Sequence, residues 1–80
     1  MKVAIITGAS SGIGAAVGME LHRRGWAVGL IARREERLEE LAQKLGGERV
    51  AYATADVGDL DQMKLAVGSI EKTLGSCDLM

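Results

Sequence analysis

The sequence predicts an α/β fold, in which helices alternate with the strands of a parallel sheet. Three short apolar runs recur along the 80 residues, and a segment of helical periodicity follows each of them. The first run leads directly into a turn rich in glycine. This β-α-β-α-β-α order, with the start of a fourth strand, is typical of the N-terminal half of a doubly wound parallel sheet.

The first strand is expected at residues 3–6, because Val-Ala-Ile-Ile is uninterrupted apolar sequence, as in strands buried on both faces. The glycine turn follows, and a helix is expected from Ile13. Apolar residues recur every four positions in this helix. We therefore expect its buried face to consist of Ile13, Val17 and Leu21, with Ala16 beside them.

The second strand is expected at residues 27–31, and the clearest helix of the chain at residues 35–45. Leu38, Leu41, Ala42 and Leu45 follow the i, i+3, i+4, i+7 spacing of one helical face. Two consecutive glycines, Gly46 and Gly47, are typical of the end of a helix.

The third strand is expected at residues 50–54, where β-branched or aromatic side chains alternate. Asp56 to Gly58 is expected to be a loop, and Asp59 with Gln62 forms a capping box for the last helix. That helix presents one apolar face and ends at Gly75; the face consists of Met63, Val67, Ile70 and Leu74. A fourth strand is expected to begin at residues 78–80.

The three strands are expected in the spatial order 3-2-1, which leaves the first strand at an edge of the sheet. A bare apolar edge invites pairing with another chain. We therefore expect the chain to be marginally stable alone, to form a homo-oligomer, or to be part of a longer protein.

The composition argues against several classes of partner. The formal net charge is −1, from ten basic and eleven acidic residues, and only two residues are aromatic, so nucleic acid is not an expected partner. No apolar run approaches the length of a membrane span. Cys77 and His22 alone do not form a metal-ligand cluster, so no metal is expected. A single cysteine fits a reducing compartment, and we expect a cytoplasmic protein.

Three glycines define the turn after the first strand, with the spacing G-x-x-x-G-x-G formed by Gly8, Gly12 and Gly14. Such a turn brings free backbone N–H groups and the positive end of a helix dipole to one place, which suits a phosphate. It is not a P-loop, because no lysine and Ser/Thr pair follows the last glycine. The alternative is an ordinary glycine-rich turn.

The segment Thr7-Gly8-Ala9-Ser10-Ser11-Gly12-Ile13-Gly14 resembles the cofactor motif of the short-chain dehydrogenase/reductase family, in its most populous branch. The resemblance covers the whole chain, because Arg33-Arg34 and Asp56-Val57 also stand where this family places its next cofactor contacts. It implies that residues 1–80 are the N-terminal part of a dinucleotide-binding Rossmann domain, apparently truncated.

The resemblance also implies roles for the residues of the turn. Gly8 and Gly12 would let the backbone approach the diphosphate, and Gly14 would let the helix pack on the strand. Ser10 and Ser11 would offer hydroxyls to phosphate oxygens. Ile13 would lie under the diphosphate with its N–H toward the ligand.

NADP is favoured over NAD as the cofactor. NAD enzymes of this fold place an acidic residue at the end of the second strand, where this chain has Ala32, followed by Arg33 and Arg34. Guanidinium groups there suit the 2′-phosphate of NADP. Cations at a helix N-terminus also oppose the helix dipole, which indicates that these two arginines bind an anionic ligand. The alternative is a solvated charge run.

Asp56 and Val57 follow the third strand. The resemblance implies that Asp56 accepts a hydrogen bond from the adenine amino group, with the Val57 backbone beside it. The alternative is a loop aspartate that satisfies local N–H groups.

No catalytic residue is expected within the chain. The family's Ser, Tyr and Lys would lie beyond residue 80, and Tyr52 has Asp56 rather than a lysine four residues later. The leading interpretation is the cofactor-binding segment of an enzyme that transfers hydride between NADP(H) and a carbonyl or alcohol substrate. The alternatives are a non-catalytic nucleotide-binding module and a truncated product without activity.

Overall fold

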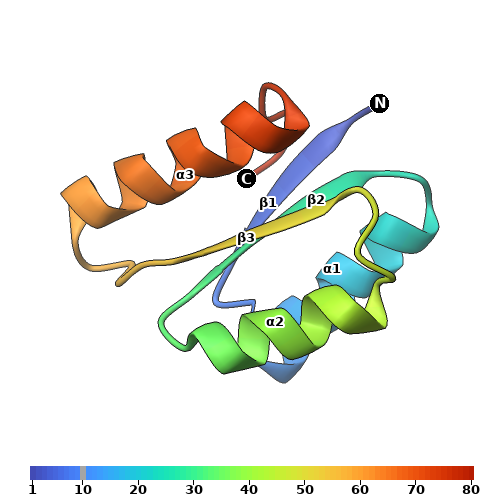
Figure 1. Cartoon of the computed structure of the whole chain (residues 1–80), viewed down its shortest axis with the longest axis horizontal. Helices are drawn as coiled ribbons and strands as arrows, with labels where there is room; N and C mark the ends of the chain where they lie inside the picture. Colours follow the sequence, from blue (N-terminus) through green and yellow to red (C-terminus); the bar gives the residue numbers. More distant parts are fainter. Residues whose placement is uncertain (10) are drawn as a thin grey trace.

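The computed structural model describes residues 1–9 and 11–80 and has three layers (Figure 1). A parallel sheet lies between α3 on one side and α1 with α2 on the other. Its elements are β1 (Val3–Thr7), α1 (Gly12–Arg23), β2 (Ala27–Ala32), α2 (Glu35–Lys44), β3 (Val50–Thr54) and α3 (Leu60–Leu74). Within these described residues, no helix is both long enough and apolar enough to span a membrane.

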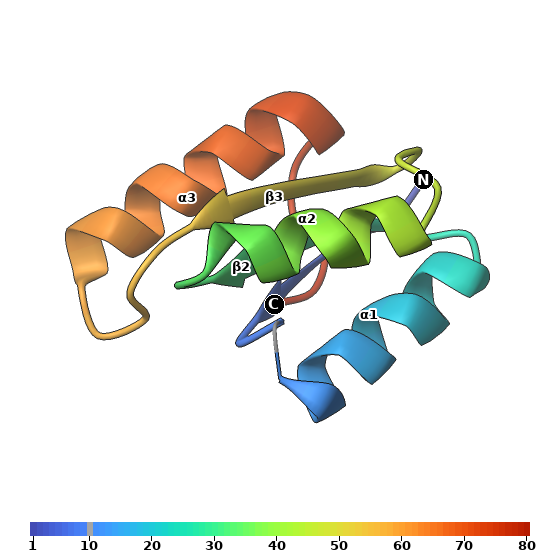
Figure 2. The same ribbon diagram turned by 60° about the horizontal axis from the view of Figure 1, so that its bottom comes forward.

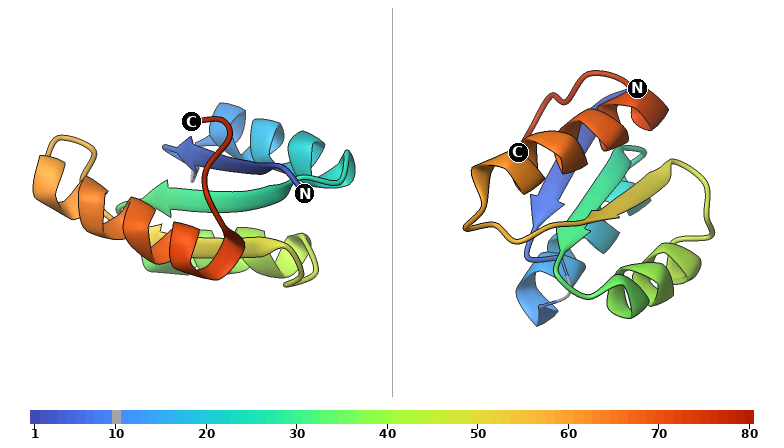
Figure 3. Two further views of the ribbon diagram at one scale, coloured as in Figure 1. Left: turned by 90° about the horizontal axis from the view of Figure 1, so that it is seen from above. Right: turned by 60° about the vertical axis from the view of Figure 1, so that its left-hand side comes forward.

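The sheet has the order β1-β2-β3, and both neighbouring pairs are parallel, which confirms the expected 3-2-1 arrangement. Ala4 lies opposite Val28 in one pair, and Val28 lies opposite Val50 in the other. All arrowheads therefore point the same way (Figure 3, left). The three connections from strand to helix therefore all leave from the carboxyl ends of the strands, as a second view also shows (Figure 2).

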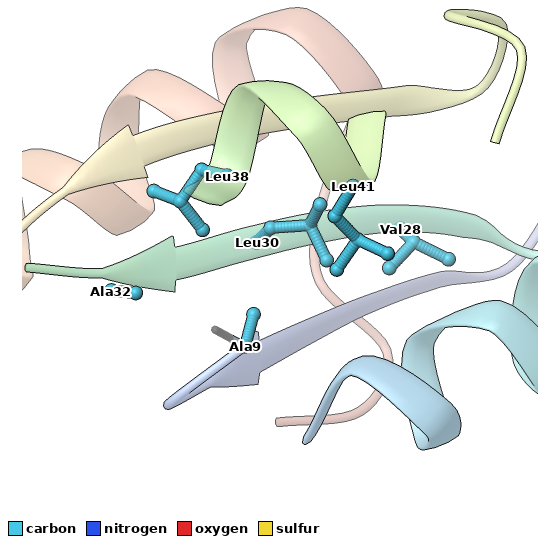
Figure 4. Packing of buried hydrophobic residues seen from close by; sticks show 6 residues of the cluster. All are labelled: Ala9, Val28, Leu30, Ala32, Leu38 and Leu41. Atoms are coloured by element: carbon cyan, nitrogen blue, oxygen red, sulfur yellow. The ribbon is translucent and has the colours of Figure 1, made fainter. Parts of the chain in front are cut away.

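Residues of β2 alternate between the two faces of the sheet, as the period of a strand requires. Val28 and Leu30 pack with Leu38 and Leu41 of α2, in a cluster that Figure 4 shows from close by. Ile31 packs instead with Ile70 of α3 on the opposite face. Burial of β2 on both faces explains why its sequence is apolar throughout.

Helix α1 does not bury the face that its apolar spacing predicts. Ile13 is 83% exposed and Val17 is 45% exposed, whereas Gly18 is buried against the side chains of β1 and β2. The i, i+4 pattern of large residues was therefore the wrong indicator for Ile13 and Val17. Leu21 of the predicted face does pack against the core, whereas Ala16 is exposed. The helix thus packs through Ala15, Gly18 and Leu21, and the buried glycine allows a close approach to the sheet.

The outer edge of β1 is partly covered by the C-terminal segment, which returns beside it (Figure 3, right). The Ile5 N–H donates to the Leu79 carbonyl at 2.8 Å, and the Val3 N–H donates to Asp78 Oδ2 at 2.8 Å. Leu79 forms an isolated parallel bridge with Ala4. The expected start of a fourth strand thus reduces to this single bridge, which supplies partners for part of the edge.

Candidate functional site

The glycine turn links the carboxyl end of β1 to the start of α1, and two of its glycines are required by geometry. Gly8 has φ +66°, a left-handed conformation that other residues rarely adopt. A Cβ on Gly14 would lie 2.5 Å from the Gly8 carbonyl oxygen. Gly14 therefore lets the first turn of α1 approach the preceding backbone, as the family resemblance implies.

Ser11 caps α1 and organises the turn around it. Its hydroxyl accepts a hydrogen bond from the Gly14 N–H at 3.1 Å and donates one to the Gly8 carbonyl at 2.8 Å. A hydroxyl has a single proton to donate. A phosphate oxygen can therefore accept a hydrogen bond from the Ser11 hydroxyl only if it replaces the Gly8 carbonyl oxygen as the acceptor. Ser10, the other serine predicted to contact phosphate, lies outside the described residues.

Two backbone amides at the start of α1 are available to an anion. In the part of the chain that the structure describes, neither the Gly12 nor the Ile13 N–H donates a hydrogen bond to the protein. A Cβ added to Gly12 would meet nothing within 4 Å, so open space lies beside this backbone. Unpaired amides, open space and the positive end of a helix dipole together fit a diphosphate.

A cavity of about 680 Å³ extends from the glycine turn across the carboxyl ends of the strands, and we call it the main cavity. Residues at or after the carboxyl ends of all three strands contribute to its walls. They are Gly8, Ser11, Ala32, Arg33, Arg34, Arg37, Ala55 and Val57. Ligands of open α/β sheets bind in this position, outside the carboxyl ends of the strands.

The predicted pair Arg33 and Arg34 lines the main cavity, but just before the helix rather than in its first turn. Arg34 is the N-cap of α2, and Glu35 and Glu36 occupy the first turn. These two carboxylates complement the helix dipole. The dipole therefore gives less reason to expect a bound anion here than the sequence indicated. The case for anion binding rests on the cavity that both arginines line.

Arg37 lines the same cavity, and sequence reasoning missed it. It stands four residues after Arg33 and three after Arg34, the spacings that bring helical neighbours to one side. Those spacings were visible in the sequence, but they pointed to a site only once the cavity was known.

The loop after β3 is held by its own hydrogen bonds. Asp56 Oδ1 accepts from the Gly58 N–H at 2.9 Å, and the Asp56 N–H donates to Gln62 Oε1 at 2.9 Å. Gln62 is thus not used as the capping box predicted, although Asp59 does accept from the Gln62 N–H at 3.1 Å. Asp56 thus satisfies a local N–H group through Oδ1, as the alternative interpretation predicted. A hydrogen bond from adenine would have to be accepted by Oδ2.

Asp56 shares a smaller cavity of about 240 Å³ with Arg33, whereas Val57 stands on the wall of the main cavity and is 60% exposed. The predicted residues after β2 and after β3 are therefore brought together beyond the carboxyl ends of these strands. This is the arrangement that contacts to a single nucleotide require.

The opposite end of the sheet holds the other three arginines, and each of them has a protein partner. Arg23 and Arg24 pair with Glu20 at 2.7 and 2.6 Å. Hydrogen bonds from Arg23 and then Arg24 lower the pKa of Glu20 to about 2. Arg49 Nη1 donates to the carbonyls of His22 and Trp26 at 3.2 and 2.9 Å, and thereby holds the end of α1.

The parallel sheet with its alternating helices is the N-terminal half of a Rossmann-type fold. The family model of the short chain dehydrogenases matches residues 2–80, so the chain belongs to this family of oxidoreductases. The chain is similar to glycine betaine reductase from Emericella nidulans, with 46% identity over 81 residues, an alignment that covers 99% of this chain and 6% of that protein.

Two solved structures with bound cofactor are also similar. One is an alcohol dehydrogenase from the archaeon Thermococcus sibiricus complexed with 5-hydroxy-NADP (TM-score 0.90, 38% identity, covering 99% of this chain and 35% of that one). The other is L-sorbose reductase from Gluconobacter frateurii complexed with NADPH and L-sorbose (TM-score 0.89, 38% identity, covering 98% of this chain and 31% of that one). The chain thus spans about a third of the length of both enzymes.

Proposed function

We propose that residues 1–80 are the cofactor-binding, N-terminal part of a short-chain oxidoreductase that prefers NADP over NAD. The observation that carries the proposal is the main cavity, in which the glycine turn and three arginines face one space. The solved relatives bound to 5-hydroxy-NADP and to NADPH support the choice of cofactor.

Each part of the site has a separate task in this proposal. The N–H groups of Gly12 and Ile13 hold the diphosphate, and Gly8 and Gly14 shape the turn that presents them. Arg33 and Arg34 neutralise the 2′-phosphate of the adenosine ribose. Asp56 and the Val57 backbone flank the adenine. Ser10 and Ser11 remain proposed phosphate contacts, with Ser11 exchanging its bond to Gly8.

The bound cofactor supplies or accepts a hydride, and in the whole enzyme the partner is a carbonyl or alcohol substrate. The tyrosine, lysine and serine that the family uses for proton transfer would be supplied by sequence after residue 80. A Tyr-x-x-x-Lys motif downstream supports the enzyme. Its absence supports the alternative, a module that binds nucleotide without chemistry.

Calorimetric titration of the chain with NADPH, NADH and 2′,5′-ADP tests the proposal. We expect NADPH and 2′,5′-ADP to bind more tightly than NADH, because only they carry the 2′-phosphate. Equal affinities for NADPH and NADH would contradict the preference, and no binding of any of the three would contradict the site.

Two glycine variants isolate the role of the turn. A Cβ at either Gly12 or Gly68 would meet nothing within 4 Å, and both glycines lie in helices, so alanine is sterically tolerated at both. We expect Gly12→Ala to stay folded but to lose affinity, because the methyl group blocks the approach of the diphosphate. Gly68→Ala, on α3, is the matched control and should bind as the parent chain does.

The predicted self-association and cytoplasmic location remain part of the proposal. Sedimentation of the purified chain measures the first: a monomer at all concentrations would contradict it. Microscopy of the tagged protein in cells measures the second.

A further inference from the structure

Arg37 is a charged residue that the fold does not use. It is the third residue of α2 and exposed, and its side chain lines the main cavity together with Arg33 and Arg34. It also lines a smaller cavity of about 180 Å³ with Ala9 and Ala15, which belong to the glycine turn and α1. Arg37 thus borders both cavities from the first turn of α2, across from the glycine turn and α1.

The Arg37 guanidinium has no protein partner among residues 1–9 and 11–80, although a carboxylate is within reach along the helix. Glu40 follows three residues later and borders the same small cavity. The Glu20–Arg23 pair has the same spacing but forms an ion pair, with the acid N-terminal to the base. That orientation is the favourable one on a helix, and Arg37 and Glu40 have the reverse.

The other charges around Arg37 leave its neighbourhood positive. Arg33, Arg34 and Arg37 line the main cavity, and none of its described lining residues is a carboxylate. Glu40 and Lys44 both border the smaller cavity and offset each other. Glu35 lines a different cavity beside β3 and α3. Three guanidinium groups therefore line one cavity, although the carboxylate of Asp56 borders the cavity of about 240 Å³ that Arg33 also lines.

We propose that Arg37 is a third specificity-determining residue, which binds the 2′-phosphate of the nucleotide together with Arg33 and Arg34. This inference rests on the proposed function. A phosphate monoester carries nearly two negative charges near pH 7 and has three terminal oxygens, so it can accept hydrogen bonds from several guanidinium groups at once. The diphosphate has the backbone amides of the glycine turn and does not need Arg37.

Two ligands that differ only in the 2′-phosphate test the assignment: 2′,5′-ADP and 5′-AMP. We expect Arg37→Gln to weaken binding of 2′,5′-ADP about tenfold, the loss typical of a hydrogen bond to a charged group, and to leave 5′-AMP unchanged. Arg37→Lys keeps the charge and should recover part of the loss. Arg24→Gln removes the same charge from the far end of α1, about 18 Å from its start, and should change neither affinity.

The outcomes separate this inference from the proposed function. If the parent chain prefers 2′,5′-ADP but Arg37→Gln keeps that preference, the role of Arg37 is wrong and the proposed function stands. If Arg37→Gln weakens both ligands equally, Arg37 contacts the 5′-phosphate side or supports the fold, and the assignment is again wrong. If the parent chain does not prefer 2′,5′-ADP, the proposed NADP preference fails and the role of Arg37 with it. Circular dichroism of each variant checks that the helices remain.

Discussion

The two ends of the sheet use arginine in opposite ways. At the end where α1 finishes, Arg23, Arg24 and Arg49 all bond to protein groups. At the end where α2 begins, Arg33, Arg34 and Arg37 line a cavity and bond to no protein group in the described part of the chain. All six are fully charged near neutral pH, so the difference lies in their partners.

This difference separates charges that stabilise the fold from charges that are available to a ligand. A substitution at the α1 end should lower stability and leave nucleotide binding intact. A substitution at the α2 end should lower nucleotide binding and leave stability intact. The following predictions test this separation, from the largest expected effect to the smallest.

Arg33→Asp should weaken NADPH binding roughly hundredfold and shift the preference toward NADH. It removes a charge-assisted hydrogen bond, worth about 1.5–3 kcal/mol, and places a carboxylate beside the 2′-phosphate. Calorimetric titration with both nucleotides measures the effect. Arg23→Asp, an equal charge reversal at the far end, is the control, and an unchanged preference in Arg33→Asp would defeat the NADP assignment.

Arg49→Ala should lower the free energy of unfolding by about 2 kcal/mol, because it removes two hydrogen bonds from a charged group to the carbonyls of His22 and Trp26. Urea denaturation measures this change. Arg34→Ala, which removes a partnerless arginine, should have the parent's stability. If both variants lost stability equally, the two groups of arginines would not differ as described.

Gln62→Ala probes a residue at the binding end that supports the protein rather than the ligand. It removes the acceptor of the Asp56 N–H and a contact to Asp59, so we expect a loss of about 1 kcal/mol in stability. The adenine side of the site should also loosen, which titration with 5′-AMP measures. Gln43→Ala, at an exposed position of α2, is the matched control and should be neutral in both assays.

The ion pairs of Glu20 with Arg23 and Arg24 predict a small dependence of the folding stability on pH, since all three side chains are exposed. The pKa of Glu20 in the fold is about 2 and its ordinary value is 4.5. A lowered pKa stabilises the fold above pH 4.5, and this contribution is lost as the pH falls toward 2. An NMR titration of the Glu20 carboxyl should show the low value, and Arg23→Gln should raise it. A Glu20 that titrates at its ordinary pKa would exclude the pair.

The strands and the helix ends could be predicted from the sequence because their signals are local. The apolar run of β2 and the two glycines after α2 each act within a few residues, and the structure places both as expected. The core face of α1 could not be predicted from large residues, because Gly18 packs where a stripe of larger side chains was sought.

The candidate site was predicted in part, for the same physical reason. The glycine turn and Arg33-Arg34 carry signals of spacing and charge that can be recognised in sequence. Arg37 and Gln62 gain meaning only from neighbours that the fold brings together, the main cavity in one case and Asp56 in the other. The left-handed φ of +58° at Arg49 had no sequence signal, since glycine is the residue usually expected there.

The bond between Val3 and Asp78 spans 75 positions, so the outer edge of β1 is covered only by residues that are synthesised long after it. During translation the outer edge of the strand that carries the glycine turn stays open until residues 78 and 79 have been synthesised. Until then its outer backbone groups are open to any strand nearby, including those of another nascent copy. The glycine turn therefore follows a strand whose outer edge is covered only after the rest of the sheet has been synthesised.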